Sequence, residues 1–306
     1  MTLPDEVRRL LDERSAAREE RDWEQADALR GEIAALGWEV QDTAGRSSAR
    51  PILPAPAAPD DPGEGPLDAP ATVAASVQLV AEDHPDDLER CLRGLAAFPP
   101  AAEWELVIVA NVPASPLDEL LASIALPVEP VIVGTDERLG WADSRTLGMR
   151  HSRGEVTILL DTSLEPTGDI VTPLLAAFED PSVGLAGGWG VTSGNGRQFE
   201  AADPGEVDAV EAYCLAIRRE ALRAVGGFDR RFRFYRNADL DLSFAVRDAG
   251  WRAVRTPPLP VDRHEHRGWA SLPEPERDRL SRRNFYRFLE HWGDRRDLLL
   301  HPDPER

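Results

Sequence analysis

The chain has 306 residues, with 55 acidic and 35 basic side chains, and its formal net charge is −20. Its length predicts about two domains, and its 42% content of hydrophobic residues is enough for a packed core. Such an acidic surface repels phosphate backbones, so we expect no nucleic-acid binding by the main domain. No apolar run approaches the roughly 20 residues of a membrane span. Because the N-terminus also lacks the apolar core of a secretory signal, we expect a cytoplasmic protein without a membrane span.

All 35 basic residues are arginines, which excludes enzymes that need a lysine Schiff base or a P-loop lysine. A Gly-x-Gly-x-x-Gly sequence after a strand is missing, which argues against a nicotinamide-dependent oxidoreductase. The zinc-site spacings His-Glu-x-x-His and Cys-x-x-Cys are absent as well. The two cysteines, Cys91 and Cys214, are too few for a disulfide framework, and Cys214 lies in an apolar run that is expected in the core.

Residues 1–46 are predicted to form a small helical hairpin, because apolar side chains recur at helical spacing in two stretches. These positions are Val7, Leu10, Leu11 and Ala17 in the first helix, and Trp23, Ala26, Leu29, Ile33 and Leu36 in the second. Gly37 is the expected stop of the second helix. Two short helices bury little apolar surface and are marginal by themselves.

Part of this segment resembles a known module. Residues 14–30, followed by residues 37–43, are similar to the C-terminal tail of cysteinyl-tRNA synthetases, and the first part also resembles the short helical motif of nucleotide-excision-repair proteins. We favour a docking hairpin that contacts a protein partner through residues 1–46, because the segment is acidic on balance. An adaptor tied to translation is the alternative.

Residues 47–71 are predicted to be an extended linker. Seven prolines fall between Pro51 and Pro70, and the residues between them offer almost nothing apolar to bury. This composition favours an extended, solvated chain. The linker is expected to separate the hairpin from a main domain over residues 72–300.

From residue 72 onward, short apolar strands alternate with helices. We expect strands over residues 73–80, 104–110, 128–133 and 156–160, and helices over residues 85–97, 117–124 and 142–151. The alternation predicts an α/β fold with a mainly parallel sheet flanked by helices. Ligands of such sheets bind beyond the carboxyl ends of the strands, and Asp161 directly follows one of these strands.

Five motifs in this domain occur in the order and spacing of a known family. They are residues 139–149 (LGWADSRTLGM), 154–161 (GEVTILLD), 216–229 (AIRREALRAVGGFD), 234–242 (FYRNADLDL) with 248–251 (DAGW), and 264–268 (HEHRG). Over residues 73–268 the chain resembles the family 2 nucleotide-sugar glycosyltransferases, which have the GT-A fold. The resemblance implies transfer of a sugar from a nucleotide-diphosphate donor to a hydroxyl acceptor, with inversion.

The resemblance also implies roles for single residues. These are Asp239 as the catalytic base, Asp241 and Trp189 on the acceptor side, and Asp161, Asn111, Arg145 and Ser163 at the donor. A weakly held divalent cation, Mn²⁺ or Mg²⁺, would neutralise the donor diphosphate, with Asp161, His264 and His266 as its ligands. Because the two histidines are two residues apart, they would face the same side of a strand.

Four positions depart from the family pattern. Ser163 stands where the metal motif has a second Asp, and Ala238 stands where a Glu precedes the base. Asn111 replaces the Asp that follows the second strand, and Thr146 replaces the Asn of the helix motif. Two alternatives therefore stay open. One is a non-catalytic binding or scaffold module with this fold, and the other is a donor held by arginines and helix N-termini with little or no metal.

The candidate residues also have structural interpretations. Asp161 could serve as a turn cap, and Asp239 as the N-terminal cap of a helix that ends at Gly250. The two histidines at positions 264 and 266 lie beside Arg263 and Arg267, so this segment could bind an anion instead of a metal.

Residues 273–300 are predicted to form one or two helices with an apolar side. The apolar residues are Leu280, Phe285, Phe288, Leu289 and Trp292, and the basic residues are Arg277, Arg279, Arg282, Arg283 and Arg287. We expect this segment to pack on its own domain with its arginines in solvent. Contact with anionic lipid or with a diphosphate is the alternative.

Overall fold

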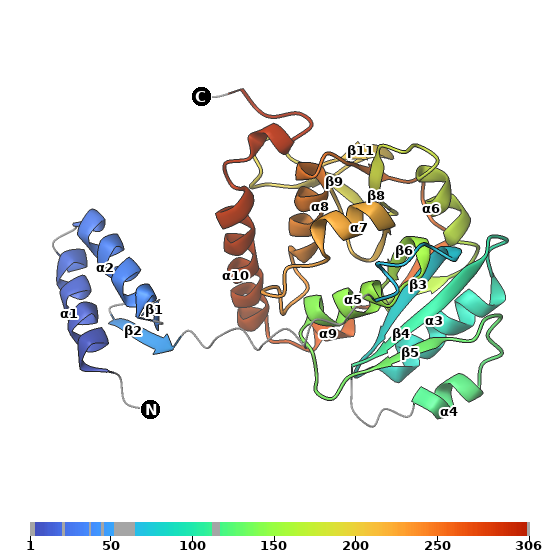
Figure 1. Ribbon diagram of the computed structural model, residues 1–306, viewed down its shortest axis with the longest axis horizontal. Coiled ribbons are helices and arrows are strands. Elements are labelled where there is room, and N and C mark those ends of the chain that lie inside the picture. Colours follow the sequence, from blue (N-terminus) through green and yellow to red (C-terminus); the bar gives the residue numbers. More distant parts are fainter. Residues whose placement is uncertain are drawn as a thin grey trace. The chain divides into compact units, whose positions relative to one another are not determined.

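The computed structural model describes residues 4–19, 22–36, 38–43, 46–51, 65–111 and 117–304 (Figure 1). The chain forms two compact units, which consist of residues 1–63 and 64–306. Within the described ranges, no helix combines the length and the apolar character that crossing a membrane requires.

The first unit contains helices α1 (Asp5–Glu19) and α2 (Trp23–Ala35) and strands β1 (Trp38–Thr43) and β2 (Arg46–Pro51) (Figure 1). Val7, Leu10 and Ile33 are buried where the elements of this unit pack together. β1 and β2 pair antiparallel along their whole length. The predicted helical hairpin is present, and a β-hairpin is added to it. Leu36 is 42% exposed, so the apolar face of α2 ends before that residue.

The first half of the second unit alternates strands and helices as predicted. Its elements are β3 (Val73–Ala81), α3 (Pro85–Ala97), β4 (Trp104–Ala110), α4 (Leu117–Ala122), β5 (Val131–Gly134), α5 (Trp141–Arg150) and β6 (Gly154–Leu160). The strand expected over residues 128–133 therefore begins later, at Val131.

The second half of this unit has shorter elements. They are β7 (Leu164–Pro166), α6 (Val171–Ala177), β8 (Val183–Gly187), β9 (Gly190–Thr192), β10 (Glu200–Ala201), β11 (Gly205–Val207), β12 (Ala209–Val210), β13 (Cys214–Arg218), α7 (Arg219–Val225), α8 (Ala238–Asp248), β14 (Arg252–Arg255), β15 (Val261–Arg263), α9 (Arg267–Ala270), α10 (Glu274–Trp292) and a short 3₁₀ helix (Arg296–Leu298).

The central sheet has eight strands in the order β11-β14-β8-β13-β6-β3-β4-β5. Strands β6, β3, β4 and β5 are parallel, and β14 is parallel to β8. β13 is antiparallel to both of its neighbours, and the edge strand β11 is antiparallel to β14. The sheet is thus mainly parallel, and the carboxyl ends of β3, β4 and β6 meet at one edge, where Asp161 follows β6.

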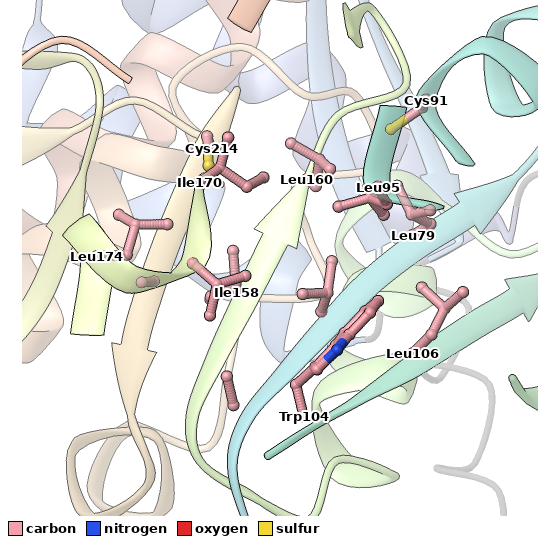
Figure 2. Close-up of a cluster of buried hydrophobic side chains, with 14 of the residues drawn as sticks. Leu79, Cys91, Leu95, Trp104, Leu106, Ile158, Leu160, Ile170, Leu174 and Cys214 are labelled. Carbon is pink, nitrogen blue, oxygen red and sulfur yellow. The ribbon is translucent and has the colours of Figure 1, made fainter. Parts of the chain in front are cut away.

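Helices cover both faces of this sheet. One apolar cluster packs the sheet against α3, α4 and α6, and a second packs it against α5, α7 and α8. Figure 2 shows the first cluster, in which Cys91 and Cys214 lie among leucine and isoleucine side chains. Both cysteines are free thiols, and burial raises the pKa of Cys214 to about 12. The expectation that Cys214 belongs to the core is confirmed.

Both ends of the range predicted as a linker, residues 47–71, take part in folded structure. Residues 47–51 pair with β1 as part of β2. At the other end Leu67 is only 8% exposed and joins the second apolar cluster. The buried guanidinium of Arg219 donates to the carbonyl oxygens of Pro66 and Ala69, and Arg223 donates to that of Leu67. These tertiary contacts, which composition does not reveal, attach residues 66–69 to the main domain. Residues 52–64 lie outside the described part of the chain.

The C-terminal helix α10 packs on α8, as expected for a segment attached to its own domain. Phe288 is buried beside Phe244, and exposed arginines pair with acidic residues of the same helix, such as Arg279 with Glu276. The helix ends at Trp292.

Candidate functional site

A cleft of about 170 Å³ lies at the carboxyl edge of the sheet. Its polar and aromatic lining consists of Trp141, Asp161, Phe199, Glu211, Tyr213, Tyr235, Arg236, Asn237, Asp239 and His266. The cleft therefore brings together two of the predicted site carboxylates and one of the predicted histidines. These three residues are separated by up to 105 positions along the chain, so the fold creates this proximity.

Asp161 is held by the residues around it. Its Oδ1 accepts hydrogen bonds from the backbone N–H of Ser163 at 2.9 Å and from the Ser163 hydroxyl at 2.5 Å. Its Oδ2 lies 3.6 Å from Nε2 of His266. Burial by itself raises the pKa of the Asp161 carboxyl, but His266 and Ser163 outweigh it and lower that pKa to about 2. Asp161 is thus a permanent anion at the floor of the cleft.

His266 is fixed in one orientation at the start of α9. Its Nδ1 accepts a hydrogen bond from the backbone N–H of Trp269, which leaves Nε2 toward Asp161. Its ring stacks on Tyr235, with 4.7 Å between the ring centroids. Burial lowers the pKa of the imidazole, but the Asp161 carboxylate more than offsets this, so the pKa of His266 is raised.

Asp239 lies in the first turn of α8, at the other side of the cleft. The helix begins at Ala238, and its N-cap residue is Asn237, whose φ of 65° is left-handed. The interpretation of Asp239 as the N-terminal cap is therefore wrong. Oδ2 of Asp239 accepts a hydrogen bond from the backbone N–H of Ala212 at 3.2 Å. Burial raises the pKa of the Asp239 carboxyl, and only backbone hydrogen bonds and Arg236 oppose this rise. A carboxylate in such a setting is a stronger base than one in water.

Arg145 and Asn111 are not part of the cleft lining. Arg145 lines a small cavity next to Asp161, stacks over the ring of Trp141 at 4.7 Å and pairs with Glu82 at 3.1 Å. Asn111 is fully buried, and its amide bonds Glu82 and both backbone groups of Leu139. Asn111 therefore holds the loop before α5 and is not among the residues that line the cleft.

Three predicted site residues lie elsewhere. His264 follows the end of β15 and bonds Glu165 at 2.8 Å, so the two histidines do not face the same side. Asp241 is turned toward α10, where its Oδ1 accepts a hydrogen bond from the indole of Trp292. Trp189 packs edge-on against Tyr213, which lines the cleft. None of these three residues is part of the cleft lining.

Sequence reasoning missed several residues that line the cleft. Tyr235 and Arg236 belong to the FYRNADLDL motif and could have been noticed there. Glu211 belongs to none of the sequence motifs, yet it lines the cleft near Asp239. Burial and the charge of Asp239 raise the pKa of Glu211. The cleft thus contains a second carboxylate near the predicted base, although position 238 lacks one.

The residues around Asp161 fit a divalent cation only in part. Oδ2 of Asp161 and Nε2 of His266 are close enough to bind one ion together, whereas Oδ1 is already bonded to Ser163. A hard divalent cation prefers several oxygen ligands, so these two donor atoms would bind it weakly unless a ligand supplied more. The weak cation site predicted from Ser163 stays a prediction, and His264 is not placed to contribute to it.

A different cluster of metal-ligating groups lies outside the cleft. Ligand atoms of Asp229, Asp241 and His291 lie within 4.8 Å of one another. The guanidinium of Arg231 bonds Asp229 at 2.6 Å and also contacts His291. Because an arginine already supplies the positive charge there, this cluster resembles an ion-pair network more than a metal centre.

Comparison with known proteins supports a two-part chain. Residues 2–50 match the family profile of the cysteinyl-tRNA ligase anticodon binding domain. A cysteine–tRNA ligase of Chlamydia caviae is 48% identical over 42 residues, which are 14% of this chain and 9% of the ligase. The chain is also 26% identical to the uncharacterized protein y4gI of Sinorhizobium fredii over 255 residues. This alignment covers 72% of this chain and 28% of y4gI. The chain thus spans less than a third of the length of each of these relatives.

Solved structures with the same fold include two glycosyltransferases. GalNAc-T7, crystallised with UDP, GalNAc and Mn²⁺, superposes with a TM-score of 0.59 at 18% identity, over 74% of this chain and 50% of that one. The mannosyltransferase PcManGT of Pyrobaculum calidifontis, in complex with GDP-Man and Mn²⁺, superposes with a TM-score of 0.52 at 17% identity, over 74% of this chain and 77% of that one. Both likenesses show the GT-A-like fold. Since the glycosyl transferase family 2 profile matches residues 77–256, more than half of the chain, this protein belongs to glycosyl transferase family 2.

Proposed function

We propose that this protein transfers a sugar from a nucleotide-diphosphate donor to a hydroxyl group of an acceptor, with inversion at the sugar carbon. The observation that carries the proposal is the cleft that contains both Asp161 and Asp239. An inverting displacement needs an anion-neutralising group at the leaving diphosphate and a base at the acceptor hydroxyl. The cleft offers Asp161 and His266 as ligands of a cation for the first role, and Asp239 for the second.

In this proposal Asp239 accepts the proton of the attacking hydroxyl. Its raised pKa makes the carboxylate a better proton acceptor, and the N–H of Ala212 fixes its orientation. Glu211 is placed to orient the acceptor by hydrogen bonding, since it lines the same cleft. The aromatic rings of Tyr213 and Tyr235 give the cleft apolar walls on which a sugar ring can pack.

The donor diphosphate is proposed to lie near Asp161 and His266. A divalent cation bound there would neutralise charge on the leaving group, and Oδ2 of Asp161 with Nε2 of His266 would hold it. Because the protein supplies only these two donor atoms, cation binding is expected to depend on the diphosphate. Both structural neighbours named above contain Mn²⁺ together with a nucleotide or nucleotide sugar, which supports by analogy a cation that accompanies the donor.

The alternative is a binding module that keeps the fold without transferring a sugar. Ser163 and Ala238 favour it, because each replaces a carboxylate of the family pattern. For the N-terminal unit we propose a docking role toward a protein partner. Its likeness to an anticodon binding domain makes tRNA the competing ligand, and fluorescence anisotropy of labelled tRNA with the full chain separates the two.

A thermal-shift screen tests the proposed function. The full chain is heated with UDP, GDP, dTDP, CDP and ADP and with their sugar conjugates, each with and without Mn²⁺. A ligand that binds only the folded state raises Tm by mass action even when turnover is too slow to detect. Binding of one nucleotide together with release of the free nucleotide on adding an acceptor supports transfer. Binding without release under any acceptor supports the binding module, and no binding at all contradicts both.

A further inference from the structure

Two arginines lie over one indole ring, that of Trp269, which is next to the cleft residue His266. The guanidinium carbon of Arg236 lies 5.4 Å from the ring centroid of Trp269, and that of Arg277 lies 5.2 Å from the same centroid. Arg236 precedes α8 and Arg277 belongs to α10, so different elements bring the two positive charges together. Both positive charges therefore lie within reach of the same indole ring.

Arg236 acts electrostatically on the cleft carboxylates Glu211 and Asp239, whose raised pKa values it opposes, but it forms no direct ion pair with them among the described residues. Across the described residues, no carboxylate forms an ion pair with Arg236 or Arg277, and no side-chain hydrogen bond from either is present. Nε of Arg277 is buried and lacks a hydrogen-bond partner. Arg279, on the same helix as Arg277, shows the usual arrangement, because it pairs with Glu276 at 2.5 Å.

The position of Trp269 connects these arginines to the proposed diphosphate site. The backbone N–H of Trp269 bonds Nδ1 of His266, whose other nitrogen faces Asp161. The Trp269 ring also contacts Tyr235 edge-on, and Tyr235 stacks on His266. Arg236 itself lines the cleft. The unpaired charges therefore lie beside the histidine at which a leaving diphosphate would be neutralised.

The loop that carries Arg236 is held in place by α10. Nδ2 of the buried Asn284 donates to the carbonyl oxygens of Phe234 and Arg236, at 2.6 and 2.8 Å. In the opposite direction, Nδ2 of Asn237 donates a hydrogen bond to the carbonyl oxygen of Ser281 in α10. Stacking on Trp269 restrains the guanidinium plane while its N–H groups stay available. This is a preorganised arrangement for binding an oxyanion.

We propose that Arg236 and Arg277 bind the diphosphate of the nucleotide donor. In the family pattern a second carboxylate of the metal motif helps to hold a cation that neutralises the diphosphate. Because Ser163 replaces that carboxylate, the two arginines supply part of the neutralising charge instead. The inference rests on the proposed function. A diphosphate suits the site because it carries more than one negative charge and presents several oxygens to two forked donors. A cation that arrives with the donor can assist, but binding does not require it.

Isothermal titration calorimetry of the full chain tests this assignment. The titrants are inorganic pyrophosphate and the nucleotide diphosphate that gives the largest thermal shift, each in EDTA and in Mn²⁺. The proteins are the wild type, Arg236→Gln, Arg277→Gln and the double variant, with Arg279→Gln as the matched control. In EDTA, each single variant should weaken both titrants roughly tenfold or more, the effect of losing one charge-assisted hydrogen bond. The control should stay within about twofold of the wild type.

Lysine variants separate a lost contact from a lost fold. Arg236→Lys and Arg277→Lys keep the charge and should recover part of the affinity, whereas a variant with an altered Tm has lost structure. Equal affinity of wild type and double variant overturns the inference and leaves the proposed function standing. Binding that appears only with Mn²⁺ also overturns it. If the variants lose affinity for glucuronate or glucose 6-phosphate but not for pyrophosphate, the arginines serve the acceptor and the inference is wrong. If pyrophosphate binding depends on the arginines but no nucleotide binds more tightly than pyrophosphate, the anion site stands and the proposed function fails.

Discussion

Asp161 and His266 face each other across the donor end of the cleft, with 3.6 Å between Oδ2 and Nε2. The contact lowers the pKa of Asp161 and raises that of His266, so each partner favours the charged form of the other. Asp161 directly follows β6, and His266 is the N-cap residue of α9. Their contact therefore joins the central sheet to the segment that follows β15. The charge state of this pair gives the first prediction.

Replacing His266 should destabilise the protein more at low pH than at high pH. The pKa of His266 in the folded protein lies above its ordinary value of 6.5, so the stability from its charged form is fully present below pH 6.5 and is lost as the pH rises through the folded pKa. His266→Gln should lower the free energy of unfolding by about 1 kcal/mol more at pH 6 than at pH 9. Urea denaturation at the two pH values measures the difference, and the exposed His301→Gln serves as control. An equal loss at both pH values would contradict the charged pair.

Asp239→Asn should abolish most sugar transfer while donor binding persists. Loss of a general base typically reduces the rate by about 10²–10⁴-fold. Because burial raises the pKa of Asp239 above its ordinary value of 3.8, the wild-type rate should fall as the pH drops through this raised value. The rate is measured with the donor that the thermal-shift screen identifies, and the exposed Asp262→Asn serves as control. A variant that keeps more than about a tenth of the rate would show that Asp239 is not the base.

Ser163→Asp should create a metal-dependent protein. Ser163 is buried and donates to Asp161, so a second carboxylate there would repel the first one in the absence of a cation. We expect a lower Tm in EDTA than for the wild type, a rise on adding Mn²⁺, and tighter Mn²⁺ binding without nucleotide. Calorimetry with Mn²⁺ alone measures the affinity, and Ser163→Asn controls for size. Tight stoichiometric binding by the wild type itself would refute the weak site.

Leu67→Ala distinguishes an attached segment from a free linker. The side chain is 8% exposed within the second apolar cluster, so truncation should reduce the free energy of unfolding by roughly 2–4 kcal/mol. A residue in a solvated linker would have almost no effect. Ile132→Ala, at a side chain that is 42% exposed, should change stability by about 0.5 kcal/mol or less. Guanidinium denaturation gives both values, and equal effects of the two variants would restore the linker interpretation.

Two mid-helix glycines should respond to alanine in opposite directions. A Cβ at Gly94 in α3 would lie 2.6 Å from the carbonyl oxygen of Pro166 in β7, whereas one at Gly31 in α2 would meet nothing within 4 Å. Gly94→Ala should therefore destabilise its unit by roughly 1–3 kcal/mol. Gly31→Ala should stabilise its helix by up to about 1 kcal/mol, because alanine has the higher helix propensity. Thermal denaturation measures both, and a stabilising Gly94→Ala would contradict the close packing of α3 on β7.

The sequence by itself determined the sheet and the place of two carboxylates. Apolar strands alternating with helices specify a buried, mainly parallel sheet, because only that arrangement covers such strands on both faces. Asp161 could be placed at a ligand-binding edge because it directly follows an apolar strand. Asp239 could be placed near it only through the resemblance to the family, since no periodicity relates positions so far apart.

Tertiary structure decided which neighbouring residues enter the cleft. The histidines at positions 264 and 266 were expected on one side because strand alternation was extended past its end; β15 stops at Arg263, after which side-chain directions no longer alternate. Asp241 shares a helix with Asp239 but faces α10, where Trp292, 51 residues further on, takes its carboxylate as hydrogen-bond acceptor. Arg219 likewise fixes residues 66 and 69 from about 150 positions away. Such contacts depend on how distant segments pack, and local sequence patterns carry no information about which distant donor will meet a given acceptor.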